Sequence, residues 1–287
     1  MKLCVSSYSF AQYTRAEKMT LIDCVVKAKE MGFDAIEFID IPGETQEDRL
    51  KLAQQIRDKA DEVGLEIIAY TVGAKLYQPT EELLTAEVER LKAQVDIAAV
   101  LGASIMRHDA CWKLTKTGAG RSFDQMLPTI AEGARRVTAY AAEKGIRTCS
   151  ENHGRIAQDS ERMERLFNAV AHDNYSLLLD LGNFTGVGEN PANAVSRLAP
   201  YAIHVHIKDL LIREEAFEGG RMTRNGGYTR AVPAGEGNVP IKRCLAILKA
   251  AEYDGAVSIE YEAAEDCLSG IARGTENVRR ILTELDW

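Results

Sequence analysis

Short apolar segments alternate with longer amphipathic segments along the whole chain. The apolar segments have the length and composition of buried strands, and the amphipathic segments follow the 3.6-residue period of helices that bury one face. The predicted strands are residues 2–10, 35–40, 66–73, 104–110, 147–154, 176–184, 202–210 and 256–263. The predicted helices are residues 19–32, 45–63, 80–101, 122–144, 159–171, 190–199, 240–252 and 268–284.

Glycines mark the ends of several of these helices. Gly32, Gly64, Gly102 and Gly145 each follow a periodic segment, as a left-handed C-terminal cap does, and each leads directly into a strand. Eight strand-helix units in succession predict an α/β fold, a single (β/α)8 TIM barrel over residues 1–287. The alternative is an open, doubly wound sheet, but the first turn has no GxGxxG motif and polar residues end many strands.

Composition narrows the function classes. The 287 residues carry a net charge of −8, so a broad phosphate-binding surface is not expected and nucleic acid is excluded as a partner. The N-terminal segment has no sustained apolar run, which predicts no signal peptide, no membrane span and a cytoplasmic location. The six cysteines are scattered singly, so we expect buried, reduced thiols.

The segment "AIHVHIKDLL", residues 202–211, alternates apolar residues with unusual polar ones. Successive side chains of a strand point to opposite faces, so His204, His206 and Lys208 share one face and the residues between them share the other. In a closed barrel that polar face points to the axis. His204 lies deeper than His206, and is either a core histidine with its hydrogen bonds satisfied or a partner that orients His206.

The last four predicted strands each supply one side chain of the kind that binds metals. These are Glu151, Asp180, His206 and Glu260. A single acidic residue at a strand end is more often a helix cap or a surface charge, but four on consecutive strands indicate a site. Three carboxylates and an imidazole favour Mg²⁺, Mn²⁺ or Co²⁺, whereas zinc would be favoured by cysteine ligands.

These segments resemble the xylose isomerase-like TIM barrel family, which includes ketose 3-epimerases, hydroxypyruvate isomerase and inosose-processing enzymes. The resemblance covers essentially the whole chain and is carried by "SENHG", "LLLDLGNF", "HVHIKD", "GEGNVP" and "YDGAVSIEYE". It implies that Glu151, Asp180, His206 and Glu260 bind one divalent ion and that the two glutamates also move protons.

The chemistry expected of such a site is proton abstraction beside a carbonyl group. An ion that binds the carbonyl oxygen and a neighbouring hydroxyl oxygen acidifies the intervening C–H bond and stabilises the enediolate. Glu151 and Glu260 are the predicted acid/base pair, which makes the leading hypothesis an isomerase or epimerase of a keto-sugar or related hydroxy-ketone. The alternative is a lyase, a dehydratase or 3-keto-glycoside eliminase, that uses the same site.

The residues predicted to contact substrate are His108, Trp112, His153, Asn183, Lys208 and Arg221. Ketose 3-epimerases of the family have a histidine and a glutamate where this chain has Asn183 and Ala157, which argues against a free ketohexose as substrate. His108 and Trp112 are candidates for a leaving-group acid and a stacking surface, and each has an alternative structural role. Lys208 either neutralises an oxyanion or pairs with Asp209.

Residues 211–239 are too long for an ordinary strand-to-helix connection. The segment carries four arginines, Arg213, Arg221, Arg224 and Arg230, among glycines. It either folds over the site and offers guanidinium groups to an anion, or forms a solvated loop whose glutamates balance the charge.

Two other function classes are disfavoured. The nuclease branch of the superfamily needs a histidine-rich zinc cluster, which an acidic chain with five histidines does not favour. A sugar-sensing barrel without activity is disfavoured by the intact ligand set. We expect a small sugar or polyol-derived substrate and a homo-oligomer; the sequence leaves open the exact substrate, its phosphorylation and the physiological metal.

Overall fold

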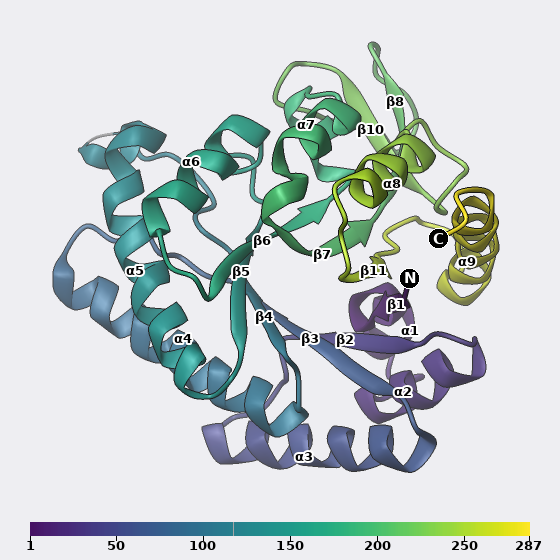
Figure 1. Cartoon of the computed structure of the whole chain (residues 1–287), viewed down its shortest axis with the longest axis horizontal. Helices are drawn as coiled ribbons and strands as arrows, with labels where there is room; N and C mark the ends of the chain where they lie inside the picture. The colour runs from purple at the N-terminus through teal and green to yellow at the C-terminus, as the bar shows by residue number, and fades with distance from the viewer. Residues whose placement is uncertain (117) are drawn as a thin grey trace. The chain divides into compact units, whose positions relative to one another are not determined.

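The computed structural model describes residues 1–116 and 118–287. Eight parallel strands close into a barrel in the order β1-β11-β7-β6-β5-β4-β3-β2, which confirms the predicted (β/α)8 fold. The strands are β1 Leu3–Ser6, β2 Ala35–Ile39, β3 Glu66–Val72, β4 Ile105–His108, β5 Arg147–Glu151, β6 Tyr175–Asp180, β7 Ala202–Ile207 and β11 Ala256–Ile259 (Figure 1).

The predicted helices are present near their expected places, and α1 is a short helix that was not predicted. They are α1 Ala11–Arg15, α2 Leu21–Glu30, α3 Gln46–Val63, α4 Glu81–Leu101, α5 Phe123–Glu143, α6 Ser160–Val170, α7 Pro191–Leu198, α8 Ile241–Ala250 and α9 Cys267–Glu284. Short 3₁₀ helices are η1 Ser7–Phe10, η2 Ala119–Arg121, η3 Asn183–Val187 and η4 Ala199–Tyr201. Among the described residues, no helix is long and apolar enough to span a membrane.

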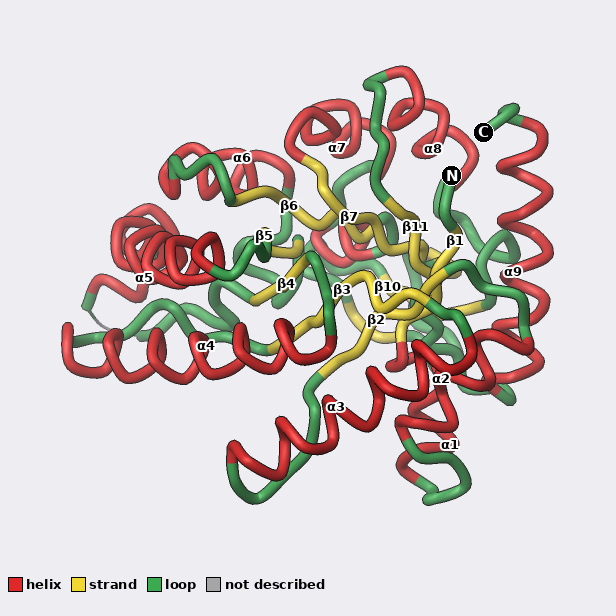
Figure 2. The backbone as a smooth tube through the Cα atoms, turned by 60° about the horizontal axis from the view of Figure 1, so that its bottom comes forward, coloured by secondary structure: helices red, strands yellow, loops and turns green. Residues whose placement is uncertain are grey.

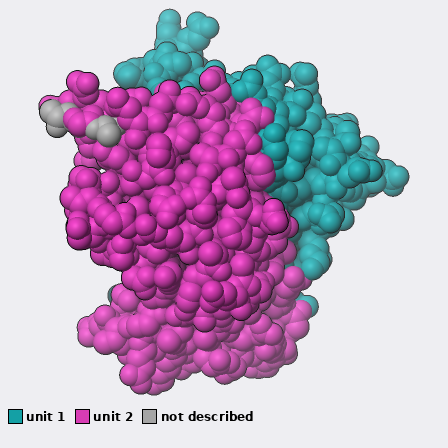
Figure 3. All heavy atoms as spheres, turned by 60° about the vertical axis from the view of Figure 1, so that its left-hand side comes forward, with its two compact units in different colours: residues 1–36, 179–287 teal, residues 37–178 magenta. Residues whose placement is uncertain are grey.

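The chain divides into two compact units (Figure 3). The terminal unit comprises residues 1–36 and 179–287, and the central unit comprises residues 37–178. That residues 1–287 form a single domain stays a prediction.

In the central unit, β3 pairs with β4, β4 with β5 and β5 with β6, all in parallel. Figure 2 shows α3, α4 and α5 side by side on this part of the chain. Gly64 and Gly102 have φ of 65° and 73°, so the left-handed caps predicted from the sequence end α3 and α4. Thr148 of β5 contacts Thr138 of α5 through their hydroxyls at 2.7 Å, which identifies the helix-facing side of β5.

In the terminal unit, β7 pairs with β11 and β11 with β1, again in parallel. The first predicted strand is shorter than expected. It ends at Ser6, whose hydroxyl accepts a hydrogen bond from the Tyr8 amide at 3.3 Å and starts η1.

The six cysteines, which are distributed over both units, are all buried and free, as expected.

Residues 211–239 have strand structure that neither of the two alternatives for this segment predicted. They form most of a three-stranded antiparallel sheet in the order β8-β10-β9, with β8 Asp209–Arg213, β9 Arg221–Met222 and β10 Tyr228–Val232. Arg213 and Arg230 both contact the ring of Phe217, with their guanidinium carbons 4.8 and 5.5 Å from its centroid. Two of the four arginines therefore hold the insertion together by cation–π contacts.

Asp209 anchors the segment between this sheet and α8. Its Oδ2 accepts hydrogen bonds from the amides of Gly235 and Gly237, both at 2.8 Å. Its Oδ1 accepts from the amides of Leu210 and Val239, at 2.8 and 3.0 Å. One buried carboxylate thus satisfies four amides of the "GEGNVP" turn and its surroundings.

Asp209→Ala is expected to lower the free energy of unfolding by about 3 kcal/mol, because buried amides lose a charged acceptor. Urea denaturation followed by circular dichroism measures the change. Asp254→Ala, at an exposed position of the same unit, is the control and should change stability by less than about 0.5 kcal/mol. Equal stabilities for the two variants would show that the turn does not depend on Asp209.

Candidate active site

Three of the predicted metal ligands come together in the terminal unit. Asp180 is the last residue of β6, His206 lies on β7, and Glu260 directly follows β11. His206 Nδ1 is 4.0 Å from Asp180 Oδ2 and 3.8 Å from Glu260 Oε1. Each residue offers one donor atom, and these atoms lie within 4.8 Å of one another.

Backbone pairing fixes this arrangement. His206 is in register with Ser258 of β11, and the Glu260 amide donates to the Ile207 carbonyl at 3.1 Å. Asp180 is fixed by its own turn, since its Oδ1 accepts hydrogen bonds from the Gly182 and Asn183 amides, both at 2.8 Å. The start of η3 therefore orients the carboxylate of Asp180.

The ammonium group of Lys208 lies among these carboxylates. Its Nζ is 2.6 Å from Glu260 Oε2, 3.2 Å from Asp180 Oδ2 and 3.4 Å from Glu262 Oε1. It also donates to Asn183 Oδ1 at 3.4 Å, which brings two predicted substrate contacts together. The alternative pairing of Lys208 with Asp209 is wrong, because the carboxylate of Asp209 is directed to backbone amides.

The donor set of the terminal unit fits a divalent ion. Two atoms bound to one ion at about 2.1 Å each are at most about 4.2 Å apart, and the two separations from His206 fall inside that limit. Carboxylate oxygens with one imidazole nitrogen suit Mg²⁺, Mn²⁺ or Co²⁺. The short contacts of Lys208 show that these carboxylates already attract a cation.

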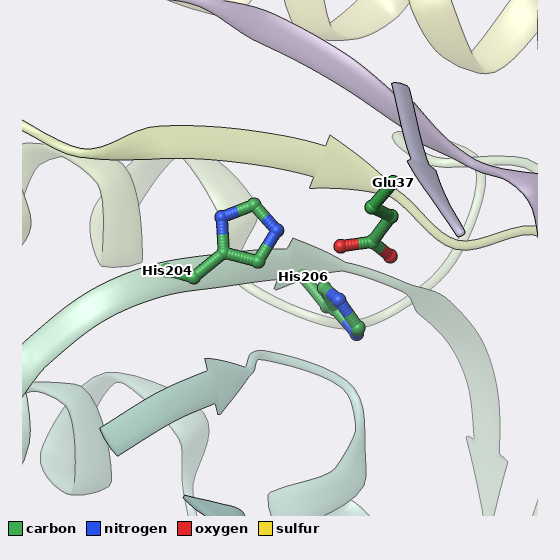
Figure 4. Close-up of side chains that lie close together, drawn as sticks. All are labelled: Glu37, His204 and His206. Atoms are coloured by element: carbon green, nitrogen blue, oxygen red, sulfur yellow. The ribbon is translucent and has the colours of Figure 1, made fainter. Parts of the chain in front are cut away.

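His204 lies two residues before His206 on β7, on the same face of the strand, and is fully buried. Figure 4 shows the two histidines on this strand. Their ring centroids are 5.5 Å apart with the planes at 84°, so His204 packs edge to face against His206. It thereby restricts the ring rotation of the candidate ligand.

In the central unit, Glu151 ends β5 and contacts Arg107 of β4. Arg107 Nη2 is 2.5 Å from Glu151 Oε2 and 2.9 Å from Asp109 Oδ1. Asp109 Oδ1 in turn is 3.0 Å from His153 Nδ1. Sequence reasoning missed Arg107 and Asp109, although they flank His108 in the segment "RHDA".

Electrostatics in this group favour the charged forms of two residues. Burial acts to raise the pKa of Asp109, but the charge of Arg107 and the hydrogen bond with His153 outweigh it, and the pKa is lowered. Burial likewise acts to lower the pKa of His153, yet the hydrogen bond with Asp109 and the charge of Glu151 prevail and raise it. In this Asp109–His153 dyad, the same contact between His153 Nδ1 and Asp109 Oδ1 thus shifts both pKa values toward the charged forms.

Trp112 lies beside this dyad. Its ring packs edge to face on His153 with centroids 4.7 Å apart, and 47% of the residue is exposed. An exposed indole next to a half-buried imidazole is a surface on which a sugar ring can pack. The substrate-binding roles of Trp112 and His153 stay predictions.

His108 and Arg221 are placed less favourably for substrate contact. His108 is fully buried with its ring 6.2 Å from that of Tyr175, and it is in register with Ser150, which has the parity of the helix-facing Thr148. Burial lowers the pKa of His108, which disfavours its acidic form. This placement favours the structural interpretation over a leaving-group acid, while Arg221 is exposed on β9.

The strand register relates Glu151 to the strand that carries Asp180. Glu151 of β5 pairs with Leu178 of β6, and Asp180 lies two residues further along β6. Glu151 and Leu178 are therefore neighbours across β5 and β6 within the central unit.

A closed parallel barrel with ionisable side chains at the carboxyl ends of successive strands has the layout of a barrel enzyme. The chain belongs to the xylose isomerase-like TIM barrel family, whose model matches residues 25–287.

Similar proteins include both dehydratases and epimerases. Over 225 residues the chain is 26% identical to an inosose dehydratase from Clostridium perfringens, covering 74% of this chain and 73% of the relative. A D-psicose 3-epimerase from Clostridium cellulolyticum H10 has a TM-score of 0.76 at 16% identity, covering 98% of this chain and 99% of that chain. A 3-keto-D-glucoside 4-epimerase from E. coli has a TM-score of 0.73 at 17% identity, with the same coverage. At these identities, the structural matches show a shared fold.

Proposed function

We propose that this protein is a divalent-metal-dependent isomerase or epimerase of a keto-sugar or related hydroxy-ketone that acts through an enediolate. The observation that carries the proposal is the grouping of Asp180, His206 and Glu260, with the ammonium of Lys208 among them. Burying charged groups costs desolvation free energy, and clusters of such groups are typical of sites that bind an ion or a substrate.

The proposed ligand set is Glu151, Asp180, His206 and Glu260. Support for Glu151 comes from its position at the end of β5, next to the strand that ends in Asp180. A bound divalent ion would polarise the substrate carbonyl and stabilise the negative charge that forms on its oxygen. Mn²⁺, Mg²⁺ or Co²⁺ is proposed on the basis of the ligands.

The chain's own residues would then move the protons. Glu260 and Glu151 are the proposed base and acid, each beside a cation of its own unit, Lys208 and Arg107 respectively. Lys208 and Asn183 are placed to bind substrate oxygens near Asp180. Removal of a proton by one glutamate and return by the other gives an isomer or epimer.

A lyase is the second candidate, and two observations favour it. The curated relative from Clostridium perfringens is an inosose dehydratase that matches about three quarters of each chain. The Asp109–His153 dyad beside Trp112 offers a positioned proton donor for a leaving hydroxyl group. In both candidates the substrate is a small sugar or polyol derivative; a homo-oligomeric assembly and a cytoplasmic location stay predictions.

Proton NMR in D₂O tests the proposal directly. The protein is loaded with Mn²⁺ or Mg²⁺ and incubated with ketohexoses, hydroxypyruvate, an inosose and a 3-keto-glycoside, and the ion is chelated before acquisition. Deuterium beside the carbonyl in a product that is an isomer or epimer of the substrate, with no loss of water or aglycone, would support the isomerase or epimerase. Loss of water or of an aglycone would support the lyase instead.

Removal of the ion is expected to stop this exchange. Pre-incubation with EDTA should lower the rate by at least about 10³-fold, because the carbonyl loses its Lewis acid, and added Mn²⁺ should restore it. The control for the Mn²⁺-loaded protein is EDTA saturated with Mn²⁺ at the same concentration. Full exchange in protein shown by elemental analysis to be free of metal would contradict the proposed role of the ion.

A further inference from the structure

The guanidinium group of Arg107 bridges two buried carboxylates in the central unit. One nitrogen, Nη2, contacts both Glu151 Oε2 at 2.5 Å and Asp109 Oδ1 at 2.9 Å. The other terminal nitrogen, Nη1, donates to the carbonyl of Val72 at the end of β3, at 3.4 Å. All three charged side chains are at least nine-tenths buried, so solvent contributes little to their orientation.

The strand register explains why this arginine reaches Glu151. Arg107 on β4 pairs with Cys149 on β5, and Glu151 is the next residue of the same parity along β5. The side chain therefore extends diagonally from one strand to the end of its neighbour. Asp109 contacts the same guanidinium nitrogen and also His153. His153 lies two residues after Glu151, so Asp109 connects it to the group formed by Arg107 and Glu151.

We propose that Arg107 is a positioning residue for Glu151, which holds that carboxylate in the orientation needed to bind the metal ion and to carry a proton. The inference rests on the proposed function, because it assigns Glu151 to the ligand set. An arginine can hold two carboxylates and a carbonyl at once because its nitrogens form a rigid planar fork, whereas a lysine has a single ammonium group. Outer partners of this kind tune the affinity of a metal ligand.

An ordinary structural ion pair would have a different signature. If Arg107 acts through Glu151, its replacement matters only while Glu151 carries the carboxylate. If Arg107 only supports the packing around β4 and β5, its replacement costs the same whether residue 151 is glutamate or glutamine. The non-additivity of two substitutions therefore distinguishes the two roles.

The experiment measures Mn²⁺ affinity in four proteins by electron paramagnetic resonance of the free ion. These are the wild type, Arg107→Lys, Glu151→Gln and the double variant. We expect Arg107→Lys to weaken Mn²⁺ binding about 10- to 100-fold in the wild-type background and less than about 3-fold in the Glu151→Gln background. The matched control is Arg57→Lys on α3, where an exposed arginine pairs with Asp61, and its affinity should equal that of the wild type.

Equal losses in both backgrounds, or no loss in either, would overturn the inference. If Arg107→Lys does not fold, Arg107→Met combined with Asp109→Asn keeps the local charge unchanged and should show the same loss; unchanged affinity would again refute the positioning role. A wild type that binds no Mn²⁺ overturns both this inference and the proposed function. A wild type that shows the coupling in Mn²⁺ affinity but no α-proton exchange supports the inference and contradicts the proposed reaction.

Discussion

Glu260→Gln is expected to lower the rate of α-proton exchange by about 10³-fold, with a smaller effect on KM. Glutamine keeps the size of the side chain and one oxygen that can bind an ion, but it cannot accept and return a proton. Lys208, 2.6 Å from Glu260 Oε2, loses its strongest ion pair in the variant and remains next to Asp180. Deuterium incorporation at saturating substrate measures the effect on the proton-transfer step.

The matched control is Glu265→Gln, which removes the charge of an exposed glutamate paired with Arg273 in the same unit. Its exchange rate should stay within about 2-fold of the wild type. Exchange in Glu260→Gln at the rate of the control would show that Glu260 carries no proton. Under that result, the acid/base assignment would have to move to Glu151 and the Asp109–His153 dyad.

The order and the ends of the barrel elements follow from local signals in the sequence. The helix expected at 80–101 is Glu81–Leu101, because Thr80 caps its first turn and Gly102 ends it in the left-handed region. Both are properties of one or two residues and do not depend on the rest of the fold. The strand expected at 2–10 is only Leu3–Ser6, since the hydroxyl of Ser6 accepts a hydrogen bond from the Tyr8 amide and starts a 3₁₀ helix.

The insertion at 211–239 was not predictable as a sheet. Its strands are short, and its pairing joins Arg213 to Tyr228 and Met222 to Tyr228 across two turns. Such contacts depend on chain closure rather than on periodicity, and a two-residue strand such as β9 has no measurable period. The contacts of Arg213 and Arg230 with the ring of Phe217 stabilise the segment, and its composition alone does not predict them.

The candidate site was predictable in part, because the alternation of apolar and polar residues is clear in some strands and ambiguous in the shortest ones. In the later strands, alternation and the resemblance pointed to Asp180, His206 and Glu260, and the structure groups these residues. In β4, only four residues long, alternation separates Arg107 from His108 but does not say which one faces the helices. His108 is the predicted substrate contact, but the contacts of Thr148 and Glu151 with their neighbours place His108 on the helix-facing side of β4 and Arg107 on the other.

Lys208→Met is expected to destabilise the metal-free protein by about 3 to 5 kcal/mol, because three carboxylates lose the cation among them. A divalent ion that binds Asp180 and Glu260 compensates the same charges. Mn²⁺ should therefore raise the melting temperature of the variant more than that of the wild type. Differential scanning calorimetry in EDTA and in excess Mn²⁺ measures both quantities.

The difference between the stability loss in EDTA and the stability loss in excess Mn²⁺ shows whether these carboxylates bind the ion. Lys242→Met removes an exposed lysine that pairs with Glu284 in the same unit, and it should shift stability by less than about 1 kcal/mol in either condition. If the loss in Lys208→Met were the same with and without Mn²⁺, the ion would not share the carboxylates of Lys208. The ammonium would then be only a structural counter-charge, and the metal site would have to lie elsewhere. A larger Mn²⁺-induced stabilisation in the variant requires Lys208 and the ion to compensate the same negative charge, which the 2.6 and 3.2 Å contacts lead us to expect.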